Sequence, residues 1–147
     1  MRVVAAVLCA LALAGCGSRV TGTARALQIT DTERTLVTSY FTALNDAGAQ
    51  GVKQQRDLLA DTQHPDFRDG DCTLPDGTIE VRPTMSTLRL DPDWIPPGED
   101  EHPRGVVVVV AVMLTVAQDG VEIGNQIGSQ HLVLLNGKTY GFAPCAA

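Results

Sequence analysis

The stretch that decides the fold is GVVVVVAVMLTV, residues 105–116. It is rich in valine, a β-branched residue that favours extended strands. Its run of about 11 apolar residues is too short to cross a membrane as a helix, which takes about 20. A strand that is apolar at every position is typical of one buried on both faces of its sheet. The stretch therefore predicts a central β-strand.

Two tight turns place further strands beside it. Asp119-Gly120 and Asn136-Gly137 are both predicted as two-residue hairpin turns, because these residues tolerate positive φ. Gly124 and Gly128 lie inside the intervening strand and predict a bulge or a sharp bend there. A last strand is predicted over Lys138–Phe142. The C-terminal part of the chain is thus an antiparallel meander.

Helices are predicted before the strands. Thr30-Asp31-Thr32-Glu33 has the T-x-x-E pattern of a capping box, so a helix is expected with its N-cap at Thr30 and its end near Gly48. Its apolar residues recur at helical spacing and form one buried stripe: Leu36, Val37, Tyr40, Phe41, Leu44 and Ala47. A second, shorter helix is predicted from about Gly51 to Ala60, before His64-Pro65.

The segment between helices and meander is less regular. Thr78–Val81 and Thr84–Leu90 are predicted as short strands, separated by a break or an edge at Pro83. Residues 91–104, DPDWIPPGEDEHPR, are acidic and proline-rich and are predicted as a loop. The predicted fold class is α+β, with one domain over residues 30–147 in which two helices pack on a curved antiparallel sheet.

This order of elements resembles a known fold. The stretch TERTLVTSYFTALNDAG, the Leu-Leu end of the next helix and the C-terminal meander look like the cystatin-like or nuclear-transport-factor-2-like α+β fold. That resemblance implies a cone between helix and sheet, in which some relatives, such as isomerases and polyketide cyclases, hold an Asp or His. Many relatives have no activity, and a fold alone does not supply one.

The N-terminus, MRVVAAVLCALALAGCGS, predicts export. Arg2 followed by a short apolar run is typical of a secretory signal peptide. Leu13-Ala14-Gly15-Cys16 resembles a bacterial lipobox. Together with the tether that follows, it resembles small actinobacterial lipoproteins of unknown function. The resemblance implies removal of residues 1–15, lipidation of Cys16 with acyl chains such as palmitate, and a flexible tether over 16–29. The alternative is an ordinary secretion signal with a chance cysteine.

A lipidated Cys16 predicts where the protein resides. Two acyl chains hold a protein firmly at a bilayer, whereas one chain binds only marginally. The expected location is therefore the cell membrane, with the domain lipid-anchored on the extracytoplasmic face.

Charge and cysteines narrow the possibilities further. Removing residues 1–15 takes away only Arg2, so 10 Lys and Arg remain against 17 Asp and Glu, a net charge of −7. This charge argues against nucleic acid as a partner and against electrostatic adhesion to anionic lipids.

Cys72 and Cys145 form an even pair in an oxidising compartment and predict a disulfide bond, the alternative being two free thiols.

Few residues suggest chemistry. His131 shares its strand parity with Val133 and could face the cone, which Tyr40 could also line, although a structural role is the ordinary interpretation for both. No catalytic residue and no cofactor is predicted. The three histidines show no metal-ligand spacing. Residues 69–80 resemble a calcium loop in their acids but lack its turn glycine, where Leu74 stands, so an acidic surface turn is the preferred interpretation.

Trp94 and Ile95 form a possible partner surface, because exposed aromatics beside prolines often mark one. The alternative is that Trp94 folds back to cover the core. The predicted function is accordingly a non-enzymatic binding or interaction module of the cell envelope, with the membrane and an envelope protein as partners. A carrier of a small apolar or lipid-like ligand in the cone is the alternative, and a small isomerase- or cyclase-like enzyme is the third hypothesis. The sequence does not define an oligomeric state.

Overall fold

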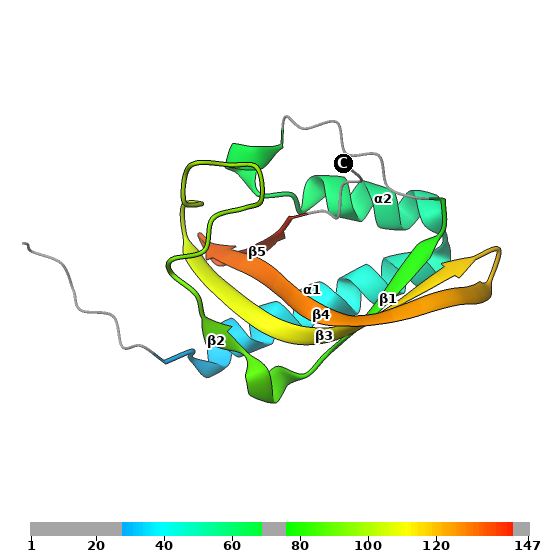
Figure 1. Cartoon of the computed structure of the whole chain (residues 1–147), viewed down its shortest axis with the longest axis horizontal. Coiled ribbons are helices and arrows are strands. Elements are labelled where there is room, and N and C mark those ends of the chain that lie inside the picture. Colours follow the sequence, from blue (N-terminus) through cyan, green and yellow to red (C-terminus); the bar gives the residue numbers. More distant parts are fainter. Residues whose placement is uncertain (1–27, 69–75, 143–147) are drawn as a thin grey trace, which may run out of the picture.

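The computed structural model describes residues 28–68 and 76–142. Two helices pack on one curled antiparallel sheet and together form a half-barrel, which confirms the predicted α+β fold class (Figure 1). The helices are α1 (Asp31–Gln50) and α2 (Val52–Asp61), with single 3₁₀ turns η1 (Pro65–Phe67) and η2 (Met85–Thr87). The strands are β1 (Thr78–Pro83), β2 (Arg89–Leu90), β3 (Val106–Gln118), β4 (Val121–Leu135) and β5 (Lys138–Gly141).

Strand β3 is the centre of the sheet. The strand order is β1-β3-β4-β5, and β2 pairs with β3 beyond the end of β1. The residues from Val107 to Val110 are each at most 4 % exposed, which confirms burial on both faces for this part of the strand. The prediction is wrong for the later part, where Met113 is 44 % exposed. Val108 and Val110 pack in the core beneath the helices, and Val107 and Val109 point to the opposite face because side chains alternate along a strand.

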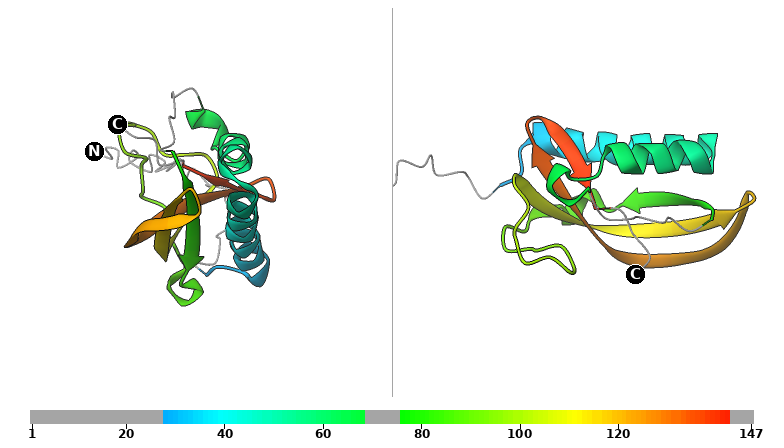
Figure 2. Two further views of the ribbon diagram at one scale, coloured as in Figure 1. Left: turned by 90° about the vertical axis from the view of Figure 1, so that its right-hand side faces the viewer. Right: turned by 90° about the horizontal axis from the view of Figure 1, so that it is seen from above.

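Helix α1 lies along one face of the sheet, as Figure 2 shows, and the core fills the space between them. The predicted capping box is present: the Thr30 hydroxyl accepts from the Glu33 N–H, and the Glu33 carboxylate accepts from the Thr30 N–H. The helix continues two residues past its predicted end, to Gln50. The buried side chains of this core are Val37, Tyr40, Phe41, Leu44, Leu59, Val81, Leu88, Val108, Val110, Val112, Leu132 and Leu134.

Two side-chain amides on the helices hydrogen-bond to the backbone at the outer edge of β1. Asn45 on α1 donates to the Val81 carbonyl at 2.9 Å and accepts from the Val81 N–H at 2.8 Å. Gln55 on α2, only 3 % exposed, does the same for Ile79, at 2.7 and 2.8 Å, and also donates to the Leu44 carbonyl. These side chains take the place of a neighbouring strand, so the edge has partners for its backbone groups.

Both hairpin turns are confirmed, with Asp119 and Asn136 at φ of 50° and 52° and a glycine of positive φ after each. The register shifts between Val116 and Ala117, which leaves Ile123 as an extra residue next to Gly124. A bulge was predicted at this position. Gly128 instead pairs regularly with Val112.

The predicted strand over Thr84–Leu90 is wrong for most of its length. Residues Met85–Thr87 form the turn η2, and only Arg89 and Leu90 pair with β3. The Ala111 carbonyl accepts from the Thr84 N–H, and the Ala111 N–H donates to the Thr87 hydroxyl. These hydrogen bonds hold the turn against β3 and take the place of regular strand pairing at Ala111.

We expect Gln55→Ala to destabilise the domain. The substitution removes three hydrogen bonds and leaves the Ile79 N–H and carbonyl without their partner, a loss of about 2–3 kcal/mol in the free energy of unfolding. Denaturant unfolding followed by circular dichroism measures it. Gln54→Ala, at the exposed neighbouring position, is the matched control and should change stability by less than about 0.5 kcal/mol. Equal effects of the two substitutions would contradict the role of Gln55 at the edge.

Candidate interaction site at the 91–104 loop

The loop over residues 91–104 packs on the face of the sheet away from the helices, beside Val107 and Val109. At its start the Asp91 N–H donates to the Val107 carbonyl at 3.0 Å. The Trp94 ring then stacks on His131 of β4, with ring centres 4.3 Å apart and planes 9° from parallel. Its ring centre also lies 4.7 Å from that of Phe142, with the two planes 66° apart. The loop is therefore packed against the sheet at its first residues.

All three histidines of the chain bond to this loop. His131 lies 2.9 Å from the Asp91 carboxylate, through Nε2 and Oδ2. His102 bonds through Nδ1 to the Trp94 carbonyl at 3.1 Å, within the loop itself. The third, His64, bonds through Nε2 to the Arg104 carbonyl at 2.9 Å. The start, the middle and the end of the loop are each held by an imidazole.

His64 is fully buried, and its hydrogen bonds indicate which ring nitrogen carries the hydrogen. The Asp66 N–H donates to His64 Nδ1 at 3.2 Å, so the ring hydrogen lies on Nε2 and is donated to the Arg104 carbonyl. Three aromatic rings surround the imidazole at centre distances of 5.4 to 5.9 Å: Phe67, Tyr140 and Phe142. Two hydrogen bonds and three ring contacts thus fix the position of the imidazole.

An ion pair joins the end of the loop to η1. The Arg104 guanidinium donates to both carboxylate oxygens of Asp66, once at 2.8 Å through Nε. These hydrogen bonds hold the pKa of the Asp66 carboxyl below its ordinary value and raise the pKa of Arg104. Because both groups are exposed, the pair orients the loop end more than it stabilises the fold.

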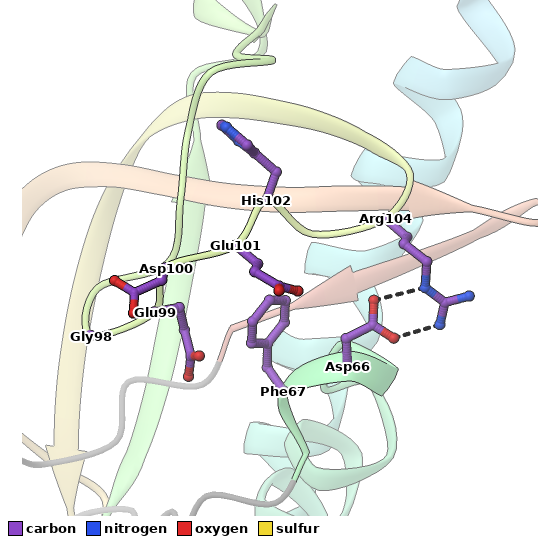
Figure 3. A pocket seen from close by; sticks show the side chains of 8 residues that line it. All are labelled: Asp66, Phe67, Gly98, Glu99, Asp100, Glu101, His102 and Arg104. Atoms are coloured by element: carbon purple, nitrogen blue, oxygen red, sulfur yellow. Dashed lines mark hydrogen bonds and ion pairs between the residues drawn. The ribbon is translucent and has the colours of Figure 1, made fainter.

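A pocket of about 470 Å³ lies between η1 and the loop. Figure 3 shows the Phe67 ring standing among the carboxylates of the loop, while His102 points away. The lining residues are Asp66, Phe67, Gly98, Glu99, Asp100, Glu101, His102 and Arg104. Arg104 neutralises Asp66. The carboxylates of Glu99, Asp100 and Glu101 make no ion pair with any described residue, so the pocket carries an excess of negative charge around an aromatic ring.

The structure does not bring Tyr40 and His131 into one cavity. Tyr40 is buried in the core on the helix side, where its hydroxyl lies against Gly141. Burial raises the pKa of that hydroxyl. His131 pairs across the strands with Val109, on the opposite face of the sheet. The two residues predicted as possible lining of one cone are therefore separated by the sheet.

Trp94 and Ile95, the predicted partner surface, are both half-buried at the base of the loop. The Trp94 ring rests on the sheet, so its contacts within the chain are established and a role in partner binding stays a prediction. Three predicted site residues lie outside the described residues: Cys16, Cys72 and Cys145. Most of the calcium-like segment over residues 69–80 lies outside them too, and Glu80 at its end pairs with Arg82.

Two features common in other proteins are absent from residues 28–68 and 76–142. No group of three or more acidic, histidine or cysteine side chains gathers there in a way that could hold a metal ion. Neither helix in these ranges has the length and apolar character needed to cross a membrane.

The pocket was missed in the sequence. Its two halves, His64-Pro65-Asp66-Phe67 and Gly98-Glu99-Asp100-Glu101, are about 30 residues apart and neither is a motif by itself. The usable signal was the run of three acids between prolines, because side-by-side carboxylates on a constrained loop concentrate negative charge.

Comparison of the chain with protein-family models, with curated proteins and with solved structures found no match in any of the three. The site is therefore interpreted from its own geometry.

We expect Trp94→Ala to destabilise the domain by about 2 kcal/mol, because the ring loses its stack on His131 and its edge contact with Phe142. Trp94→Phe, which retains an aromatic ring on His131, should recover most of this loss. Thermal unfolding of the two variants measures the difference. An unchanged melting temperature for Trp94→Ala would show that the ring does not hold the loop to the sheet.

Proposed function

We propose that the protein is an exported lipoprotein, anchored through Cys16 to the extracytoplasmic face of the cell membrane, and that its domain is a non-enzymatic interaction module. The anchoring part is supported by the sequence: Arg2, a short apolar run, and a lipobox-like end at Cys16. The net charge of the chain, −6, supports attachment by lipid in preference to attraction to anionic headgroups.

The interaction part rests on one observation, the acidic pocket beside Phe67. Glu99, Asp100 and Glu101 have no cationic partner among the described residues, so a basic group from outside complements their charge. The face of the Phe67 ring adds attraction for the same cations. The proposed occupant is a lysine- or arginine-containing segment of an envelope protein.

The way the loop is held supports this proposal. Three imidazole bonds, the Trp94 stack and the Arg104–Asp66 pair place the loop before any partner arrives. A loop that is already ordered loses less conformational entropy on binding, so more of the contact energy contributes to affinity.

Nothing in the described residues favours the other two hypotheses. A carrier needs space between α1 and the sheet, and fully buried side chains such as Val37, Val108 and Leu132 pack against one another there. An isomerase- or cyclase-like enzyme needs an acid or a histidine that faces the cone. The one histidine on the meander is His131, which bonds to Asp91 and lies beneath Trp94.

The anchor is tested by Cys16→Ala. Loss of the acyl-accepting thiol should move the protein from the membrane fraction to the soluble fraction, measured by immunoblotting after fractionation. An unmodified chain processed in parallel is the control and should stay with the membrane. Retention of the Cys16→Ala chain in the membrane fraction would refute lipid anchoring at this cysteine.

The pocket is tested with a tetra-arginine peptide as the probe. The combined substitution Glu99→Gln, Asp100→Asn and Glu101→Gln should weaken its binding to the full chain about tenfold, since each exposed charge pair contributes up to about 1 kcal/mol. Isothermal titration calorimetry at low salt measures the affinity.

The matched control removes three exposed carboxylates elsewhere, by Asp46→Asn, Asp61→Asn and Asp119→Asn, and changes net charge equally. Its affinity for the peptide should stay close to that of the unmodified chain. Equal weakening by both triple substitutions would mean that the peptide responds to net charge alone, and the pocket proposal would be wrong.

A further inference from the structure

Among the residues that the structure describes, the outer edge of β4 is unpaired over most of its length. Strand β4 runs from Val121 to Leu135, but β5 pairs only with Leu132–Leu135. Among the described residues no other strand pairs with β4 on that side. The edge from Val121 to Gln130 therefore presents backbone N–H and carbonyl groups that can accept another strand.

The two edges of the sheet are treated differently. The edge of β1 is closed by the Asn45 and Gln55 amides, as described above. The β4 edge carries no lysine and no proline, the residues that commonly block unwanted strand pairing. Glu122 is its single acidic or basic residue apart from His131. This edge is thus not protected in the usual ways.

Exposed apolar side chains gather on the same hairpin. In the described part of the chain, the large apolar residues classed as exposed are Met113 on β3 and three residues of β4: Val121, Ile123 and Ile127. Ile127 is 78 % exposed and pairs across the strands with Met113. Leaving them in water is unfavourable, so a contact that covers them gains stability.

Charge indicates which partner fits this edge. The chain has a net charge of −6, and the loop that carries its acidic pocket lies at the end of the sheet opposite the β3–β4 hairpin tip (Figures 1 and 2). The β4 edge carries a single acidic residue, Glu122, so a second, equally acidic copy meets little repulsion there. An antiparallel edge can also pair with itself about a two-fold axis. An axis near Asn125 sets Ile123 of each copy opposite Ile127 of the other.

We propose that two copies of this chain pair through their β4 edges, forming one continuous antiparallel sheet across a two-fold axis near Asn125. Each copy contributes one open β4 edge and both are paired in the dimer, so no further copy can add in this way. The contact is confined to one strand of each copy, so we expect it to be smaller than the about 1,200–2,000 Å² of stable interfaces and the dimer to be weak in solution. This inference concerns a different surface from the acidic pocket and does not depend on its role.

Photo-crosslinking of the full chain in membranes tests the pairing. A photoreactive benzoylphenylalanine is incorporated in place of Asn125, in cells that make two versions of the chain with different epitope tags. Illumination should give a covalent dimer that carries both tags. The same photoreactive residue in place of Thr42, on the exposed face of α1, is the control for mere crowding at the membrane and should give less than about a tenth of that product.

Ile127→Lys should reduce the mixed-tag dimer at least tenfold, because it sets a charge in the apolar contact of both copies. Ile127 is highly exposed, so the substitution leaves the fold intact, and Ile123→Lys provides a second test of the same kind. A dimer that survives both substitutions, equal crosslinking from Thr42, or products only with other proteins would each overturn the proposal.

Discussion

The structure depends on one constraint: strand β3 is apolar on both faces and has to be covered on both. Helix α1 covers the face that carries Val108 and Val110. The loop over residues 91–104 covers the other face beside Val107 and Val109, with Trp94 as its largest contact. Beyond these layers β3 continues with β4 as an extended hairpin, and there its apolar side chains emerge into solvent. One valine-rich strand thus accounts for the position of the core, the loop and the exposed strip.

The loop that completes this covering also concentrates charge. Three adjacent carboxylates at Glu99, Asp100 and Glu101 repel one another, and nothing among the described residues neutralises them. Segments of this composition stay extended and mobile unless other contacts hold them. Here the anchors lie on either side of the acidic run, at Asp91 and Trp94 before it and at Arg104 after it. Order at the two ends therefore allows an acidic surface of definite shape between them.

Much of the fold could be predicted from local patterns. The capping box at Thr30, the valine run of β3 and the two glycine turns each depend on residues close in sequence, and all are present. The roles of Gln55 and His64 could not be predicted in this way, because their partners, Ile79 and Arg104, lie 24 and 40 residues away. One local signal pointed to Gln55: it is a polar residue between the apolar positions Val52 and Leu59 on one face of a short helix. The pocket was the hardest part to predict from local patterns, because it forms only where two segments far apart in the sequence meet.

The stacking of Trp94 on His131 has an optical consequence. The chain contains one tryptophan, so all of its indole emission comes from the joint between the loop and the sheet. The indole is half-buried there, in contact with the His131 imidazole and the Phe142 ring. Any displacement of the loop changes the polarity and the quenching around that single fluorophore. The protein therefore carries a built-in spectroscopic reporter of its loop, which needs no label.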